Sequence, residues 1–300
     1  MVKGSFPSGG MPRRTPRKSE ANAPNPPAEE LSSTPLPMVG AASHRSEIAR
    51  PPGRSPPPNP VRVERGVVIF DLDGTLLDDL SLISHVAGEV MHQVFGTPPE
   101  EARIHYLATT GLPFEAQLAQ LYPTAPVQLR ASAAATFHQR KVTEAYAHAG
   151  PFPEVPGMLK RLAQARWTLV VSTGGETEMA ELVLEREGLR FWFEAVLGSR
   201  EGTKREHLAE YRRRYPDAPL ILVGDSRFDM ETAQSLPGIV GIGRASRIHG
   251  WALTPGDLTR WGAAWSDYSL AGLPDALEEI LARPPRSSGR RKNPRAGTRK

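Results

Sequence analysis

Short apolar runs alternate with segments of helical periodicity through the middle of this 300-residue chain. Five runs of four to six residues are too short for buried helices, and the first is rich in Val and Ile, which favours strands. We expect strands at residues 66–71, 167–172, 195–198, 219–224 and 239–242, with a weaker edge strand at 267–270.

Helical spacing fills most of the intervals between these strands. Leu82, Val86 and Val90 recur at four-residue steps, as on one face of a helix. Gly96 then supplies a stop, so we expect a helix over 81–95. Further helices are expected at 113–121, 127–148, 156–166, 176–187, 204–215, 228–236 and 273–282, with a short one beginning near residue 99. Residues 244–266 show no regular pattern beyond a short helix after Pro255.

The alternation of apolar strands with helices predicts a parallel sheet that is covered by helices on both faces, an α/β fold. No strand pattern appears between residues 76 and 151, so this interval predicts an all-helical insert. Ligands of open parallel sheets bind at the carboxyl ends of the strands. We therefore expect the functional site at that edge.

The first strand leads directly into Asp71-Leu72-Asp73-Gly74. Period 2 places both carboxylates on the same side of an extended backbone. Two carboxylates held together at a strand end are costly unless a cation lies near them, and Gly74 allows a sharp turn. The tetrapeptide also fits an ordinary polar turn, in which Asp and Gly are common.

Further polar residues stand at the ends of the other predicted strands. Ser172 ends the second strand, and Asp225 follows the fourth. Each has an ordinary alternative: Lys204 also fits a surface position on a helix, and Ser172 also fits a helix cap. Asp225 and Asp229 together also fit a capping pair at a helix start. Because Asp71, Ser172 and Asp225 all fall at carboxyl ends of one parallel sheet, we favour a shared site.

In this order and spacing, Asp-x-Asp, Ser, Lys and Gly-Asp-x-x-x-Asp resemble the four motifs of the haloacid dehalogenase superfamily over residues 65–282. The chain looks like the phosphatase branch with a helical C1-type cap, similar to phosphoglycolate phosphatase and β-phosphoglucomutase. The resemblance implies a Rossmann-like core at 61–77 and 152–282, with an inserted cap domain at 78–151. It also implies a Mg²⁺-dependent phosphohydrolase that acts on a small phosphate monoester through an aspartyl-phosphate.

The resemblance assigns roles to individual residues. Asp71 is expected to be the nucleophile and Asp73 the general acid and base. The expected Mg²⁺ ligands are Asp71, the backbone carbonyl of Asp73, and Asp225. Asp229 is expected to orient Asp225, the waters on the metal or Lys204 without binding the metal itself. Lys204, Ser172 and Thr173 are expected to bind the phosphoryl oxygens. The sequence departs from many relatives in having Thr173 where they have Asn and Arg205 where they have Pro.

Asp73 argues against a dehalogenase, because a halide leaving group needs no proton. A phosphomutase of the β-phosphoglucomutase type stays open, since mutases share Asp-x-Asp and the helical cap. Substrate contacts are expected from the cap, with His105 and Thr110 as candidates whose alternative is ordinary packing. A helical cap suits a small-molecule phosphate ester better than a folded protein.

The two ends of the chain differ from its middle. Residues 1–60 hold 14 of the 30 prolines, with eight Lys or Arg and four Asp or Glu. Residues 283–300 hold eight Lys or Arg and no acid, so 21 of the 37 basic and 29 of the 33 acidic residues remain in 61–282. The middle is therefore acidic although the whole chain is +4. We expect both ends to be disordered basic tails.

Composition limits the remaining classes of function. The chain has no cysteine, which excludes disulfides and thiolate zinc sites. No apolar run reaches the ~18 residues of a membrane span, and no signal peptide is evident. We expect a cytoplasmic enzyme, with organelle targeting by the N-terminal tail left open. A third hypothesis is a nucleic-acid-associated or scaffold protein whose basic tails make weak, non-specific contacts. The sequence predicts no oligomeric state.

Overall fold

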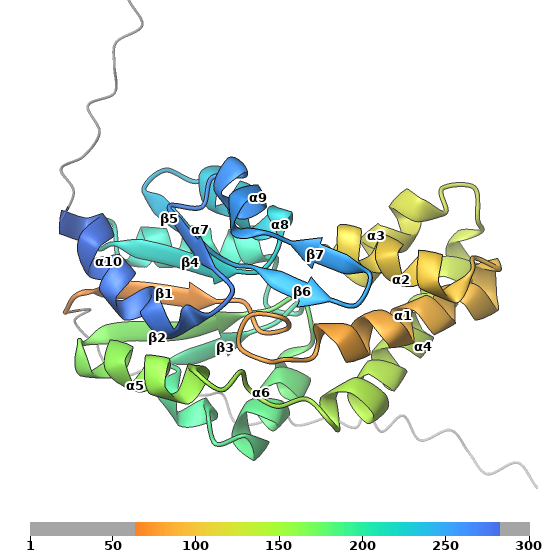
Figure 1. Cartoon of the computed structure of the whole chain (residues 1–300), viewed down its shortest axis with the longest axis horizontal. Coiled ribbons are helices and arrows are strands. Elements are labelled where there is room, and N and C mark those ends of the chain that lie inside the picture. Colours follow the sequence, from red (N-terminus) through yellow and green to blue (C-terminus); the bar gives the residue numbers. More distant parts are fainter. Residues whose placement is uncertain (1–63, 283–300) are drawn as a thin grey trace, which may run out of the picture. The chain divides into compact units, whose positions relative to one another are not determined.

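The computed structural model describes residues 64–282. The predicted tails at 1–60 and 283–300 lie outside this range, as do residues 61–63 of the predicted core. Within the range, strands and helices alternate nearly as the apolar pattern predicts (Figure 1).

A six-stranded parallel sheet forms the centre of the fold, in the order β3-β2-β1-β4-β5-β8. Its strands are β1 (Gly66–Phe70), β2 (Trp167–Ser172), β3 (Ala195–Leu197), β4 (Leu220–Gly224), β5 (Ile239–Arg244) and β8 (Trp265–Asp267). All five residues of β1 are buried. Because β1 is paired on both sides, the carboxylates that follow it stand in the middle of the sheet edge.

Apolar side chains of β1 alternate between two clusters, one on each face of the sheet. Val68 and Phe70 belong to one cluster, and Val67 and Ile69 belong to the other. This alternation is the period of two that strands impose. The surrounding helices are α5 (Val155–Gln164), α6 (Thr177–Arg186), α7 (Lys204–Arg214), α8 (Arg227–Gln234), α9 (Pro255–Arg260) and α10 (Leu273–Ala282), with 3₁₀ turns at Arg190–Trp192 and Leu270–Gly272. The predicted α/β fold class is confirmed.

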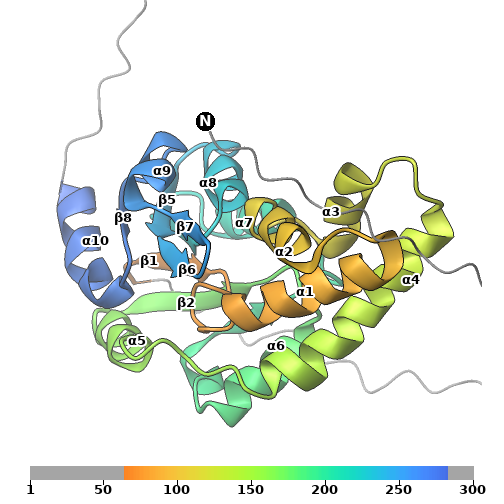
Figure 2. The same ribbon diagram turned by 45° about the vertical axis from the view of Figure 1, so that its right-hand side comes forward.

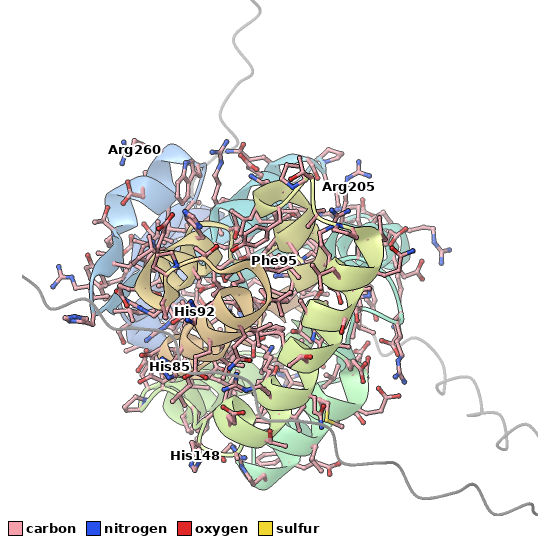
Figure 3. All side chains as sticks on the ribbon, turned by 90° about the vertical axis from the view of Figure 1, so that its right-hand side faces the viewer. His85, His92, Phe95, His148, Arg205 and Arg260 are labelled. Carbon is pink, nitrogen blue, oxygen red and sulfur yellow. The ribbon has the colours of Figure 1, made fainter. Side chains whose placement is uncertain are left out.

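Helices occupy the long interval between β1 and β2. They are α1 (Leu80–Phe95), α2 (Pro99–Ala108), α3 (Phe114–Leu121), α4 (Val127–Arg140) and a π-helix, η1 (Lys141–Tyr146). Figures 1 and 2 show them gathered at the end of the sheet toward which β1 points. Figure 3 views this end, where α1 presents the exposed His85 and His92. The single helix predicted over 127–148 is thus an α-helix that widens into a π-helix.

The chain leaves the sheet region before the helical interval and returns after it at adjacent positions. Leu77 forms isolated bridges with both Asp73 and Pro151. The amide of Asp78 donates to the carbonyl of Gly150 at 2.9 Å, and that of Phe152 donates to Leu76 at 3.1 Å. Backbone hydrogen bonds therefore join the two crossings.

The segment predicted to be irregular contains an antiparallel hairpin, β6 (Ser246–Ile248) and β7 (Trp251–Leu253). Both strands are short, and β6, which is Ser-Arg-Ile, contains no apolar run, so the sequence pattern does not reveal the pair. The tip of the hairpin is held from outside, because the guanidinium of Arg103 on α2 donates to the carbonyl of His249. The last strand, β8, begins two residues earlier than predicted. Among residues 64–282, no helix has the length and apolarity of a membrane span.

Candidate active site

The ends of three neighbouring strands place the predicted residues together. Asp71 follows β1, Ser172 ends β2, and Asp225 follows β4. Phe70 is in register with Val171 on one side and Val223 on the other. The amide of Asp71 donates to the carbonyl of Val223 at 2.8 Å, which extends the pairing one residue beyond the strand. The three side chains therefore start from adjacent positions on one edge.

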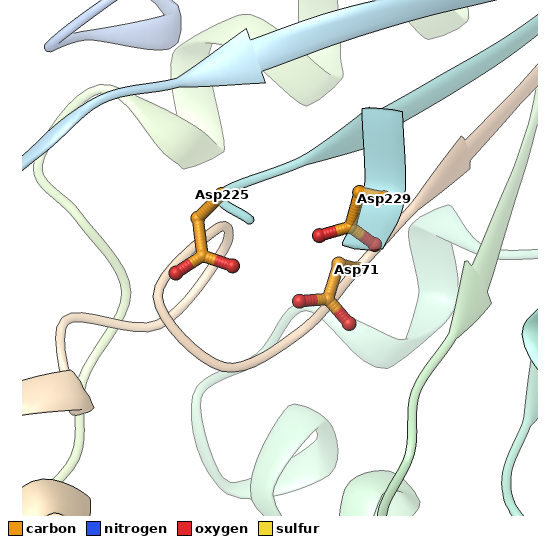
Figure 4. A group of neighbouring side chains, drawn as sticks. All are labelled: Asp71, Asp225 and Asp229. Atoms are coloured by element: carbon orange, nitrogen blue, oxygen red, sulfur yellow. The ribbon is translucent and has the colours of Figure 1, made fainter. Parts of the chain in front are cut away.

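Three carboxylates converge at this edge, as Figure 4 shows. Asp71, Asp225 and Asp229 are buried, and one oxygen from each lies within 4.8 Å of the others. The ammonium of Lys204, at the first position of α7, lies 2.9 Å from Asp71 Oδ1 and also pairs with Asp229. One lysine therefore faces three buried carboxylates.

This imbalance shifts the proton affinities of the cluster. Burial, reinforced by the nearby carboxylates, raises the pKa of Asp71 to about 7, even though Lys204 opposes the shift. Burial and the charges of Asp71 and Asp229 raise the pKa of Asp225 well above its ordinary value. The Asp225 Oδ2 atom is buried without a hydrogen-bond partner among the described residues. Buried oxygens of this kind fit a cation site, because a divalent cation relieves both the repulsion and the missing contact.

Asp229 serves two purposes at once. As the third residue of α8, it completes a capping box with Ser226, whose amide donates to Asp229 Oδ2 at 3.1 Å. The other oxygen, Oδ1, pairs with Lys204. The capping and charge-orienting interpretations of Asp229 therefore describe different oxygens of one side chain.

Asp73 has different partners from Asp71. The hydroxyl of Tyr146 donates to its Oδ1 at 2.8 Å, and the ammonium of Lys141 pairs with its Oδ2. Burial acts to raise the pKa of Asp73, but Lys141 and the hydrogen bonds from Tyr146 and Asp79 outweigh it, so the pKa is lowered. These contacts favour the carboxylate form of Asp73.

Ser172 and Thr173 face different surroundings. Ser172 is fully buried, and its Oγ lies 2.9 Å from Nδ1 of His207. Burial lowers the pKa of His207, so the imidazole is neutral at pH 7. Thr173 lines a cavity at this edge, and its hydroxyl accepts from the amide of Gly175 at 3.1 Å. Of this pair, only Thr173 faces the cavity.

The cavity, of about 300 Å³, joins the sheet edge to the helical interval. Asp71, Asp73 and Lys204 line it from the sheet side. Residues of the helical interval that line it include Tyr106, Thr110, Gly111, Phe114, Gln117, Phe137, His138 and Lys141. His105 is not in the lining and lies on α2, 3.8 Å from Glu101. Of the two substrate candidates, the structure brings only Thr110 to the cavity.

Comparison with known proteins bears on what this site does. The family model described as haloacid dehalogenase-like hydrolase matches residues 68–238, which is more than half of the chain. The chain belongs to this hydrolase family. The predicted family, fold class and hydrolase activity are confirmed.

Relatives of this hydrolase carry phosphatase names. The chain is 31% identical over 192 residues to a probable phosphatase, IndB, of Dickeya dadantii (strain 3937), which covers 61% of this chain and 82% of that protein. It is 26% identical over 219 residues to a phosphoglycolate phosphatase of Rhodobacter capsulatus, which covers 70% of this chain and 96% of the relative. These names support the predicted phosphatase branch.

Solved structures show the same fold. A predicted phosphatase from Clostridium acetobutylicum superposes with a TM-score of 0.60 at 22% identity, covering 72% of this chain and 99% of that one. A hydrolase from Pseudomonas syringae gives a TM-score of 0.61 at 19% identity, covering 72% and 99%.

Four residues of this hydrolase's site escaped the sequence analysis: Lys141, Tyr146, Asp79 and His207. Asp79 is buried and accepts from the amide of Gly74 at 3.0 Å. Its place directly after Asp78, close to the Asp-x-Asp motif, was an available signal. Lys141 and Tyr146 lie in a segment that has the pattern of an ordinary Ala-rich helix. His207 was hidden because only the tertiary fold brings it to Ser172.

Proposed function

We propose that this hydrolase is a phosphatase that cleaves a small phosphate monoester through an aspartyl-phosphate on Asp71. The observation that carries the proposal is that Asp71, Asp73 and Lys204 line one cavity, with Lys204 2.9 Å from Asp71. A nucleophile, a proton carrier and a fixed positive charge are the groups that phosphoryl transfer needs. The names of the curated relatives support the same reaction.

Mg²⁺ is the cofactor that we propose, held by Asp71, Asp225 and the backbone carbonyl of Asp73. The carboxylate cluster and the unpartnered Asp225 Oδ2 fit this hard cation, which prefers oxygen ligands. When bound, Mg²⁺ supplies positive charge that favours ionised Asp71 and offsets the charge of the phosphoryl group. Asp229, through Lys204 and the start of α8, keeps this set oriented.

The protein residues divide the reaction between them. Asp71 attacks phosphorus, and its bond to phosphorus forms as the bond to the leaving oxygen breaks. Asp73 gives that oxygen a proton and later takes one from the water that hydrolyses the aspartyl-phosphate. An approaching phosphate dianion raises the pKa of Asp73 and so favours its protonated form. Lys204 and Thr173, which line the cavity, hold the phosphoryl oxygens, and Ser172 is buried next to them with its Oγ on His207.

We propose that residues 78–151 act as a cap over the core at 61–77 and 152–282. Thr110 is the cap residue that we place beside the leaving group, since it lines the cavity, whereas His105 does not. A cavity of about 300 Å³ suits a small-molecule ester.

The test is phosphate release from a panel of phosphate monoesters, with Mg²⁺ and with a chelator. Wild type is expected to release phosphate only with Mg²⁺, and Asp71→Asn is expected to lose at least about 10⁴-fold of the rate. Asp217→Asn is the matched control, because it makes the same change at an exposed position. Full activity of Asp71→Asn would contradict the proposal. Isomerisation of a sugar phosphate without net release of phosphate would favour the phosphomutase. Loss of function on deletion of the tails, but not in Asp71→Asn, would favour a nucleic-acid-associated or scaffold protein.

A further inference from the structure

Two side chains of one short π-helix contact the carboxylate of Asp73. Oδ1 accepts from Tyr146 and Oδ2 pairs with Lys141, the last and first residues of η1. No residue of the sheet or of the helices that flank it makes an ion pair with Asp73 in the described range 64–282. We infer that Lys141 and Tyr146 are positioning residues that hold the Asp73 carboxylate in place, an inference that rests on the proposed function.

The π-helix explains how two residues five apart reach one carboxylate. In an α-helix, with 3.6 residues per turn, side chains five positions apart point in directions about 140° apart. A π-helix bonds i to i+5 and so turns less per residue. Lys141 and Tyr146 therefore come to the same side of η1, where the ammonium lies 4.6 Å from the tyrosine ring centroid. Single π-turns of this kind often mark functional sites.

Burial makes a purely structural role a poor explanation for this contact. The side chains of Lys141 and Asp73 are only 11% and 20% exposed, so pairing them has a large desolvation cost. Apolar side chains of similar volume would hold η1 against the site at least as well. The hydroxyl of Tyr146, only 4% exposed as a residue, donates to Asp73 Oδ1 at 2.8 Å. Both contacts end on the residue that we propose delivers the proton.

Lys141 and Tyr146, which together we call the clamp, should make the rate depend on the leaving group. Asp73 is needed most when the departing oxygen is a poor leaving group, such as an alkoxide. A nitrophenolate departs without a proton and does not need Asp73 for that step. Weakening the clamp should therefore slow alkyl phosphates more than p-nitrophenyl phosphate, whereas general damage to the fold would slow both alike.

The experiment measures kcat/KM of the full chain, with Mg²⁺, for p-nitrophenyl phosphate and for phosphoglycolate or glycerol phosphate as the alkyl ester. We expect Lys141→Met and Tyr146→Phe to lower kcat/KM for the alkyl ester about 10-fold or more beyond their effect on p-nitrophenyl phosphate. Lys141→Arg should recover part of the difference. Lys160→Met, an exposed lysine on α5, is the control and should change neither.

Equal losses on both substrates, or no loss on either, would overturn the clamp while leaving the phosphatase proposal intact. Absence of phosphate release by wild type from both esters would overturn the proposed function and the clamp with it. Should Lys141→Met fail to fold, Tyr146→Phe decides the matter, since it removes a single hydroxyl from a side chain whose ring is retained.

Discussion

Asp71 and Asp73 stand two residues apart in the chain, yet different parts of the fold hold them. The partners of Asp71 come from the edge of the sheet and the helices beside it, namely Lys204, Asp225 and Asp229. Asp73 is held by Lys141 and Tyr146, from a helix about 70 residues away. The comparison teaches that the proposed nucleophile depends on the sheet, whereas the proposed proton carrier depends on how the helical interval packs.

The electrostatics of the two aspartates differ in the same way. Burial and like charges raise the pKa of Asp71 to about 7, while Lys141 and hydrogen bonds lower that of Asp73. The cluster around Asp71 therefore lacks positive charge, and Asp73 has a counterion of its own. The following predictions test this division, beginning with the largest expected effect.

Removal of divalent cations should abolish phosphate release. It should also lower the stability of the folded protein, through the carboxylates around Asp71 and not through the contacts of Asp73. Mg²⁺ at about 100 times its dissociation constant should stabilise the folded protein by about 2.7 kcal/mol, because it binds only the folded state. This stabilisation is measured as an increase in melting temperature on addition of Mg²⁺. Asp225→Asn should remove most of the increase, whereas Tyr146→Phe should keep it. An equal increase in Asp225→Asn and wild type would show that the cation binds elsewhere.

Replacement of the two buried lysines should have unequal effects on stability. Lys204→Met should lower the free energy of unfolding by about 3 kcal/mol, since it leaves Asp71 and Asp229 buried without their cation. Lys141→Met should cost less, because Lys141 pairs with one carboxylate among residues 64–282 and its side chain is more exposed than that of Lys204, 11% against 5%. Urea denaturation of both variants without metal measures the difference. A larger loss for Lys141→Met would reverse our comparison.

A small change at the boundary between the two regions should disturb the cap and leave the sheet intact. A Cβ at Gly111 would lie 2.2 Å from Ser226 Oγ, beside Asp225, and its φ is +90°. Gly96 has a φ of +75° with no atom within 4 Å of such a Cβ. Alanine at either position should cost about 1 kcal/mol from backbone strain. Only Gly111→Ala should also lower kcat/KM several-fold, and equal kinetics for both variants would contradict this.

The smallest expected effect is at Ser172. Ser172→Ala removes the partner of His207 Nδ1 and should cost about 1 kcal/mol of stability. We expect little change in KM, because Ser172 does not line the cavity. Ser172 and Tyr146 share no partner, so the stability effects of Ser172→Ala and Tyr146→Phe should add in the double variant. A coupling well above about 0.5 kcal/mol would show that the two regions are not independent.

The two regions also differ in how far the sequence predicts them. Asp71, Ser172 and Asp225 were predictable as neighbours because each ends an apolar strand, and parallel strands share one carboxyl edge. Lys204 followed from the family resemblance. These assignments depend on local pattern and on the topology of a sheet.

Lys141 and Tyr146 were not predictable on those grounds. Residues 127–148 show one helical pattern, and the sequence gives no indication that the helix widens at Lys141. Their contact with Asp73 depends on the packing of η1 near α1, over a separation of about 70 residues. The hairpin β6–β7 was missed because its strands are short and β6, with Ser246 and Arg247, contains no apolar run.

The backbone hydrogen bond between Asp78 and Gly150 has a consequence for protein engineering. The backbone atoms of these residues already meet at 2.9 Å, so a turn of a few residues would bridge them. Excision of the helices between them would remove no strand and leave the order of the sheet unchanged. The sheet and its flanking helices therefore form a scaffold with one insertion point, between Asp78 and Gly150. A different set of helices grafted there would meet the same Asp71 and Lys204, but would have to bring its own partner for Asp73.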